Sequence, residues 1–117
     1  MKAYTDLEQS KKLAEILPVD SADAFYDMAE PEKRQVPIIG SPDDYYDMKD
    51  WTTPCWSLAA LIELMGECKM ERTLLDQSGE FTHSFVDDYF NIRTYEEYEI
   101  VDAAVEMILK LHEQKLL

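Results

Sequence analysis

The chain has 117 residues, a hydrophobic fraction of 46% and a formal net charge of −14 at pH 7. Its length suffices for one domain with one core, and its hydrophobic fraction is typical of globular proteins, which argues against global disorder. A strongly acidic surface repels phosphate backbones and anionic lipid, so direct binding of nucleic acid or membrane is not expected. The charge suits a basic protein partner, or it serves solubility alone.

Residues 5–17 are predicted to form an amphipathic helix. Thr5 and Glu8 have the spacing of a capping box, in which each side chain bonds the backbone amide of the other. Pro18 ends the helix. The apolar stripe of this helix consists of Leu7, Leu13, Ala14, Ile16 and Leu17.

Residues 18–50 contain four of the five prolines and show no long periodic run. Segments 21–28 and 41–48 resemble each other loosely, and each is compatible with a short extended segment or a helical turn that presents an aromatic pair. Two copies are too few for a stacked repeat. Residues 36–39 are predicted to be a short edge strand, because Pro37 cannot donate to a central ladder.

Residues 54–65 are predicted to form the central helix of the core. Thr53 is a suitable N-cap, Pro54 fits the first helical position, and Gly66 can close the helix in the left-handed conformation. Apolar side chains surround the axis, which is typical of a helix that is buried on all sides. With about 20 apolar residues needed to cross a bilayer, the segment is too short for a membrane span.

The sequence that follows predicts a β-hairpin and a second long helix. Residues 72–77 and 81–86 read as paired strands, and residues 89–92 as a third strand. Residues 95–114 form the helix, with Thr94 and Glu97 as a capping box. A single narrow polar stripe leaves most of this helix apolar, so it packs in the core or against a second subunit.

These elements predict an α+β fold in a single domain, residues 1–117. Three main helices, at about 5–17, 54–65 and 95–114, pack on a small antiparallel β-sheet at about 72–92.

The two cysteines, Cys55 and Cys68, flank the predicted central helix. The rise of a helix would place them roughly 18–20 Å apart, beyond the reach of a disulfide. Unpaired thiols and a polar N-terminus without an apolar signal segment predict a cytoplasmic protein. Cys55 at a helix N-terminus is a candidate nucleophile with His83 or His112 as base, although a packed thiol is far more common in such a setting.

We expect no metal and no cofactor. Cys55, Cys68, His83 and His112 lack the close pair spacing of a zinc site. The acids of residues 43–50 lack the alternating pattern and central glycine of a calcium loop, so they are expected to be solvated.

Aromatic residues interleave with acids between residues 23 and 56, a pattern that suits a protein-binding face because Tyr and Trp anchor interfaces. The alternative is that these rings cover the central helix. The candidate binding residues are Tyr26, Asp27, Asp43, Asp44, Tyr45, Tyr46, Asp47 and Trp51.

Residues 2–18 (KAYTDLEQSKKLAEILP) and 54–61 (PCWSLAAL) resemble a group of small uncharacterised proteins from gut Bacteroidetes genomes and their phages or mobile elements. The two motifs cover roughly a quarter of the chain, and a looser similarity extends to the last helix. The resemblance implies a bacterial or phage cytoplasmic origin, and it supplies neither an activity nor catalytic residues.

The composition favours a non-enzymatic protein-binding module that presents its acidic aromatic face to a basic partner. Three alternatives stay open. The first is an acidic inhibitor that neutralises a toxin or mimics DNA. The second is a small cysteine-dependent hydrolase built on Cys55. The third is an obligate homodimer whose last helix forms the interface.

Overall fold

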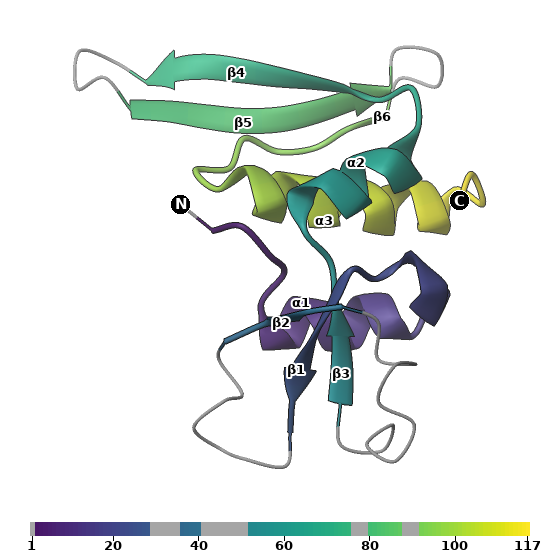
Figure 1. Cartoon of the computed structure of the whole chain (residues 1–117). Helices are drawn as coiled ribbons and strands as arrows, with labels where there is room; N and C mark the ends of the chain where they lie inside the picture. The colour runs from purple at the N-terminus through teal and green to yellow at the C-terminus, as the bar shows by residue number, and fades with distance from the viewer. Residues whose placement is uncertain (1, 29–35, 41–51, 76–79, 88–91) are drawn as a thin grey trace. The chain divides into compact units, whose positions relative to one another are not determined.

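The computed structural model describes residues 2–28, 36–40, 52–75, 80–87 and 92–117 (Figure 1). Within these ranges the chain forms three α-helices and two three-stranded antiparallel sheets, which confirms the α+β class. The chain divides into two compact units. We call Ala3–Ala60 the N-terminal unit, and Met1–Lys2 with Leu61–Leu117 the C-terminal unit.

The N-terminal unit begins with helix α1 (Leu7–Ala14), which is shorter than the predicted span of 5–17. The predicted capping box of Thr5 and Glu8 is wrong. Asp6 is the N-cap, because its side chain accepts a hydrogen bond from the Gln9 amide while the Gln9 side chain bonds the Asp6 amide. Thr5 is fully buried and bonds other partners, so its hydroxyl is not available to the helix.

A 3-10 turn (Val19–Ser21) leads into the first sheet, whose strand order is β2-β1-β3. Strand β1 (Ala24–Asp27) pairs with β2 (Ile38–Ile39) on one side and with β3 (Thr52–Cys55) on the other. The extended interpretation of segment 21–28 is therefore confirmed for residues 24–27. Strand β2 lies at the sheet edge, as Pro37 predicted, whereas segment 41–48 lies outside the described residues.

The predicted start of the central helix is wrong. Thr53 and Pro54 belong to β3, opposite Tyr26 and Phe25 of β1. Pro54 is tolerated there because β3 is an edge strand, where a missing amide need not break the ladder. Helix α2 starts later, at Leu58–Met65, and the Ser57 hydroxyl accepts a hydrogen bond from the Ala60 amide at 3.2 Å.

The expectation that this helix is buried on all sides is also wrong. Leu61 is fully buried and Met65 is 6% exposed, but Ile62 on another face is 44% exposed. Ala59 and Glu63 are exposed as well. An apolar composition therefore did not ensure that each side of α2 found a packing partner.

In the C-terminal unit, strands β4 (Lys69–Leu75) and β5 (Glu80–Asp87) form the predicted hairpin. A third strand, β6 (Ile92–Arg93), pairs with the other side of β5, so the order is β4-β5-β6. The sheet thus extends from residue 69 to residue 93, slightly beyond the predicted range of 72–92.

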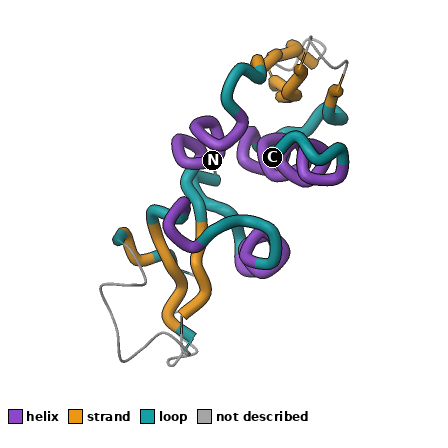
Figure 2. Tube along the Cα trace, turned by 90° about the vertical axis from the view of Figure 1, so that its right-hand side faces the viewer, coloured by secondary structure: helices purple, strands orange, loops and turns teal. Residues whose placement is uncertain are grey.

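Helix α3 (Ile100–Glu113) packs against β5 and β6, and seven of its residues are buried (Figures 1 and 2). Its buried residues are Val101, Ala103, Ala104, Val105, Met107, Ile108 and Leu111. The predicted capping box of Thr94 and Glu97 is wrong, because the Thr94 hydroxyl accepts a hydrogen bond from the Phe85 amide at 2.9 Å. Residues 95–99 consequently precede the helix instead of forming its first turn.

Candidate functional site

Two of the predicted binding residues lie in the described part of the chain, and both are buried. Tyr26 and Asp27 of β1 are 5% and 7% exposed, and the Tyr26 hydroxyl donates to the Thr5 carbonyl at 2.6 Å. Side chains this buried offer a partner little surface. The other six lie outside the described residues, so their role stays a prediction: Asp43, Asp44, Tyr45, Tyr46, Asp47 and Trp51.

Cys55 lies at the end of β3 instead of at a helix N-terminus, and it is fully buried. Burial raises the pKa of its thiol to about 12, with a further contribution from the negative charge of Asp23. Asp23 is itself held by the Ser57 amide at 2.8 Å. A buried, protonated thiol is not the form that attacks a substrate, so these surroundings argue against Cys55 as a nucleophile.

Burial also raises the pKa of the Cys68 thiol, with Asp87 contributing. His83 was a candidate base for Cys55, and the Nδ1 atom of its ring lies 3.1 Å from the Tyr98 carbonyl oxygen.

Across the described ranges, three or more His, Cys, Asp or Glu side chains nowhere gather in an arrangement that could hold a metal ion. The acids of residues 43–50 lie outside those ranges.

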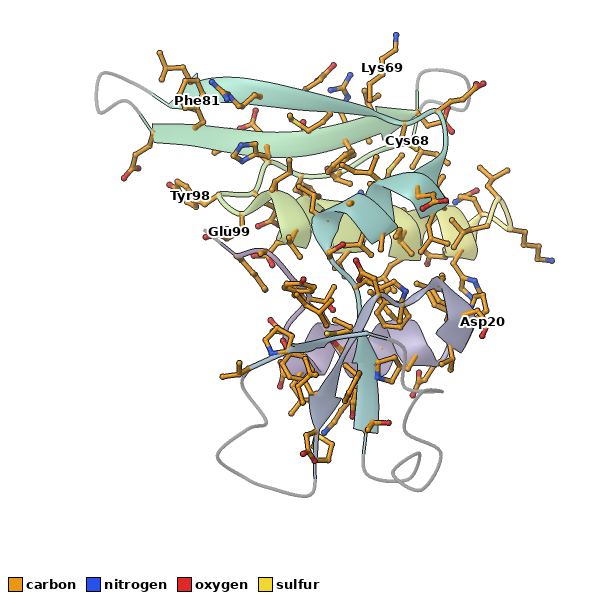
Figure 3. The ribbon with its side chains drawn as sticks, viewed as in Figure 1. Asp20, Cys68, Lys69, Phe81, Tyr98 and Glu99 are labelled. Carbon is orange, nitrogen blue, oxygen red and sulfur yellow. The ribbon has the colours of Figure 1, made fainter. Side chains whose placement is uncertain are left out.

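An exposed surface that combines rings and carboxylates does occur, in the C-terminal unit. We call Tyr95–Glu96–Glu97–Tyr98–Glu99 the acidic aromatic segment. Tyr95 is 75% exposed and Tyr98 is 65% exposed. Figure 3 shows the Tyr98 ring pointing away from the ribbon, at the same end of the sheet as Phe81.

The acidic aromatic segment is fixed to the sheet by its backbone. The His83 amide donates to the Glu97 carbonyl at 2.6 Å, and the Glu97 amide donates to the His83 carbonyl at 2.8 Å. This pair of bonds makes residue 97 a one-residue extension of the sheet beside β5. The two tyrosines are therefore presented from an anchored backbone, which reduces the entropy lost when a partner binds.

The carboxylates around this segment differ in their pairing. Lys2 serves two of them: its amide donates to Glu99 at 2.9 Å, and its Nζ lies 2.7 Å from Asp102. Lys110 Nζ lies 3.6 Å from Glu106 and 4.8 Å from the centre of the Tyr95 ring. These cations partly neutralise the acids on the first turns of α3.

Glu96 and Glu97 form no ion pair within the described residues, and Glu96 is exposed. Partial burial raises the pKa of the Glu97 carboxyl, and the nearby charges of Glu106 and Asp102 raise it further. An uncompensated carboxylate that is repelled by its neighbours gains most when a cation from another molecule approaches it.

Glutamates at 96, 97 and 99 match the acidic first turn of a helix, so their pattern predicted a helix start and not a binding segment. The signal that could have found it is the one used for residues 23–56, namely tyrosines spaced among acids. Applied to the whole chain, that criterion also selects Tyr95 and Tyr98.

A hollow of about 310 Å³ lies at another place in the C-terminal unit, lined by Ile92, Arg93, Lys110, Glu113 and Gln114. Both cations in it are engaged, since Arg93 pairs with Glu71 and Lys110 donates to the Arg93 carbonyl at 2.8 Å. It therefore presents no uncompensated cation to a ligand, whereas Glu113 in its lining has no ion pair with another described residue.

Among the helices the structure describes, none has the length and apolar character needed to cross a membrane. Comparisons with protein-family models, with curated proteins and with solved structures found no match to this chain.

Proposed function

We propose that the chain is a non-enzymatic protein-binding module that recruits a basic protein through the acidic aromatic segment. The observation that carries this proposal is the exposure of Tyr95 and Tyr98 beside Glu96 and Glu97, two carboxylates without an ion pair in the described structure. Tyrosine is enriched among the residues that dominate binding energy at interfaces.

The net charge of −14 supports the choice of a basic partner. Summed surface charge steers an oppositely charged protein toward the module and accelerates association, while the two rings supply the contact area. An origin in a gut bacterium or its phage, as the sequence resemblance implies, belongs to the same proposal.

Capture from a bacterial lysate with matched variants tests the proposal. Glu96→Gln with Glu97→Gln removes two charges from the acidic aromatic segment, and Glu8→Gln with Glu15→Gln removes two exposed charges from and beside α1. We expect a basic protein that the native chain and the α1 control retain equally, and that the segment variant loses.

Purification of that protein then allows its Kd to be measured against ionic strength. We expect affinity to fall steeply as the salt concentration approaches about 1 M, where the Debye length is roughly 3 Å and exposed charges farther apart are screened. The proposal is contradicted if both charge variants bind alike, because the effect would then reflect total charge and not this surface. Tyr98→Ser should weaken binding by about tenfold, as expected for an interface anchor.

A further inference from the structure

Strand β4 is an edge strand, and no described strand pairs with its outer side. His83 and Glu97 exchange both backbone hydrogen bonds, so the amide and carbonyl of His83 point away from β4. Alternation along an antiparallel strand then directs Thr82 and Ser84 toward β4, where they face Thr73 and Glu71. The backbone groups of Met70, Arg72 and Leu74 therefore point outward, away from β5.

Throughout the described chain, these three residues make no other backbone hydrogen bond. Each of the residues 69–74 is exposed. A row of open amides and carbonyls on a seven-residue strand is a template for another extended chain.

One face beside this edge is apolar. Met70 is 42% exposed and Leu74 is 56% exposed, and they share a face with Phe81, which is opposite Leu74 and 37% exposed. The Arg72 guanidinium lies over the Phe81 ring at 3.9 Å from its centre. On the other face, Lys69, Glu71 and Thr73 alternate with them, so the strand offers apolar contacts on one side only.

We propose that β4 binds an extended, lysine-rich segment of the basic partner by strand addition, with apolar residues of that segment packed against Met70, Leu74 and Phe81. This inference rests on the proposed function, and it names how the partner docks. The net charge of −14 favours a cationic segment through long-range attraction, since β4 itself carries Lys69 and Arg72 beside Glu71. The alternation of β4 favours a segment in which apolar and basic residues alternate.

A second copy of the chain fits this edge poorly. The antiparallel register that pairs all seven residues of β4 with themselves places Arg72 directly opposite Arg72 of the other copy, and like charges opposite each other are destabilising. Two chains of net charge −14 also repel each other at long range.

The test uses the intact protein and a synthetic probe, the capped peptide Lys-Val-Lys-Thr-Lys-Val-Lys. A control peptide has the same sequence and charge but N-methyl groups on alternate amides, which prevents strand pairing. We expect the probe to protect the amides of Met70, Arg72 and Leu74 from hydrogen exchange, and the N-methylated peptide to bind at least tenfold more weakly.

Two variants of the protein test whether the outward backbone groups of β4 are needed for binding of the probe. Arg72→Pro removes one outward amide without touching the ladder to β5, because proline is tolerated on an edge strand. Arg72→Ala removes the same charge and ring contact but keeps the amide. We expect only Arg72→Pro to lose about tenfold or more in affinity, with circular dichroism confirming that both variants fold.

The outcomes separate the two proposals. Equal, salt-sensitive binding of both peptides would overturn strand addition and leave the proposed function standing. If neither peptide binds while Glu96 and Glu97 are still needed for capture of a basic protein, strand addition is overturned alone. A dimer in sedimentation that Arg72→Pro dissolves would overturn it in favour of a second copy.

Discussion

The buried contacts around Thr5 in the N-terminal unit differ in kind from those of α3 in the C-terminal unit. In the N-terminal unit, polar groups meet around Thr5, whose hydroxyl lies 2.8 Å from that of Ser10 and accepts the Trp56 amide at 3.1 Å. The Tyr26 hydroxyl and the Trp56 ring nitrogen are also hydrogen-bonded, the latter to Ser21 at 2.9 Å. In the C-terminal unit, the buried residues of α3 are all apolar.

The difference teaches where each unit is vulnerable. A buried hydrogen-bond network fails when one partner is removed, because the remaining donors and acceptors keep their desolvation cost. An apolar helix fails when volume is removed.

The largest difference between the units should be in the reactivity of their cysteines toward a thiol reagent. At pH 8, a thiol with a pKa of about 12 has roughly 10³-fold less thiolate than an ordinary cysteine of pKa 9.0. We expect Cys68, which is only partly buried, to react with a thiol reagent in the native protein and Cys55 to react only after denaturation. Mass spectrometry of single-cysteine variants measures both rates, and equal native rates would contradict the burial of Cys55.

Removal of volume from α3 should have the largest effect on stability. Ile108 is fully buried, so Ile108→Ala should lower the free energy of unfolding by about 2–5 kcal/mol. His112→Ala, at an exposed position of the same helix, is the control and should change it little. Chemical denaturation measures both, and a loss below about 1 kcal/mol for Ile108→Ala would show that α3 is not the core element.

In the N-terminal unit, replacing a polar side chain by an apolar one of the same shape should be enough to lower stability. Thr5→Val removes the hydroxyl and leaves the Trp56 amide and the Ser10 hydroxyl without this partner, at a cost of about 1–3 kcal/mol. Thr5→Ser keeps the hydroxyl and should restore most of that loss. If valine is as stable as threonine in thermal unfolding, the polar network does not stabilise this unit.

The smallest effect concerns the pH dependence of the acidic aromatic segment. A raised pKa for Glu97 means that its protonation favours the folded state; this stability is present below about pH 4.5 and is lost as pH rises through the raised pKa. Glu97→Gln should therefore be more stable than the native chain at pH 7, by no more than about 0.5 kcal/mol because the group is largely solvated. The advantage should vanish below pH 4.5, and a variant that is less stable at pH 7 would contradict the repulsion.

Several elements could be predicted from the sequence because their signals are local. The hairpin of β4 and β5 follows from two strand-like runs separated by a short turn, and α3 follows from a sustained apolar periodicity. The edge position of β2 follows from Pro37 alone. In each case neighbouring residues contain the information that decides the structure.

The failures have a common physical cause. Thr52–Cys55 became a strand because β1, more than 20 residues earlier, offered a partner, and no local pattern contains that pairing. Similarly, Thr94 left its expected capping role because Phe85 of β5 supplied an amide. The acidic aromatic segment was missed for the same reason, since its separation from α3 depends on the pairing of Glu97 with His83.

The openness of the β4 edge is most directly tested by residue-resolved hydrogen exchange in the isolated protein. We expect an alternation along the strand, with fast exchange at Met70, Arg72 and Leu74 and slow exchange at Glu71 and Thr73, whose amides bond to β5. Slow exchange at all five would contradict the account, because the edge on which a partner is expected to dock would already be covered.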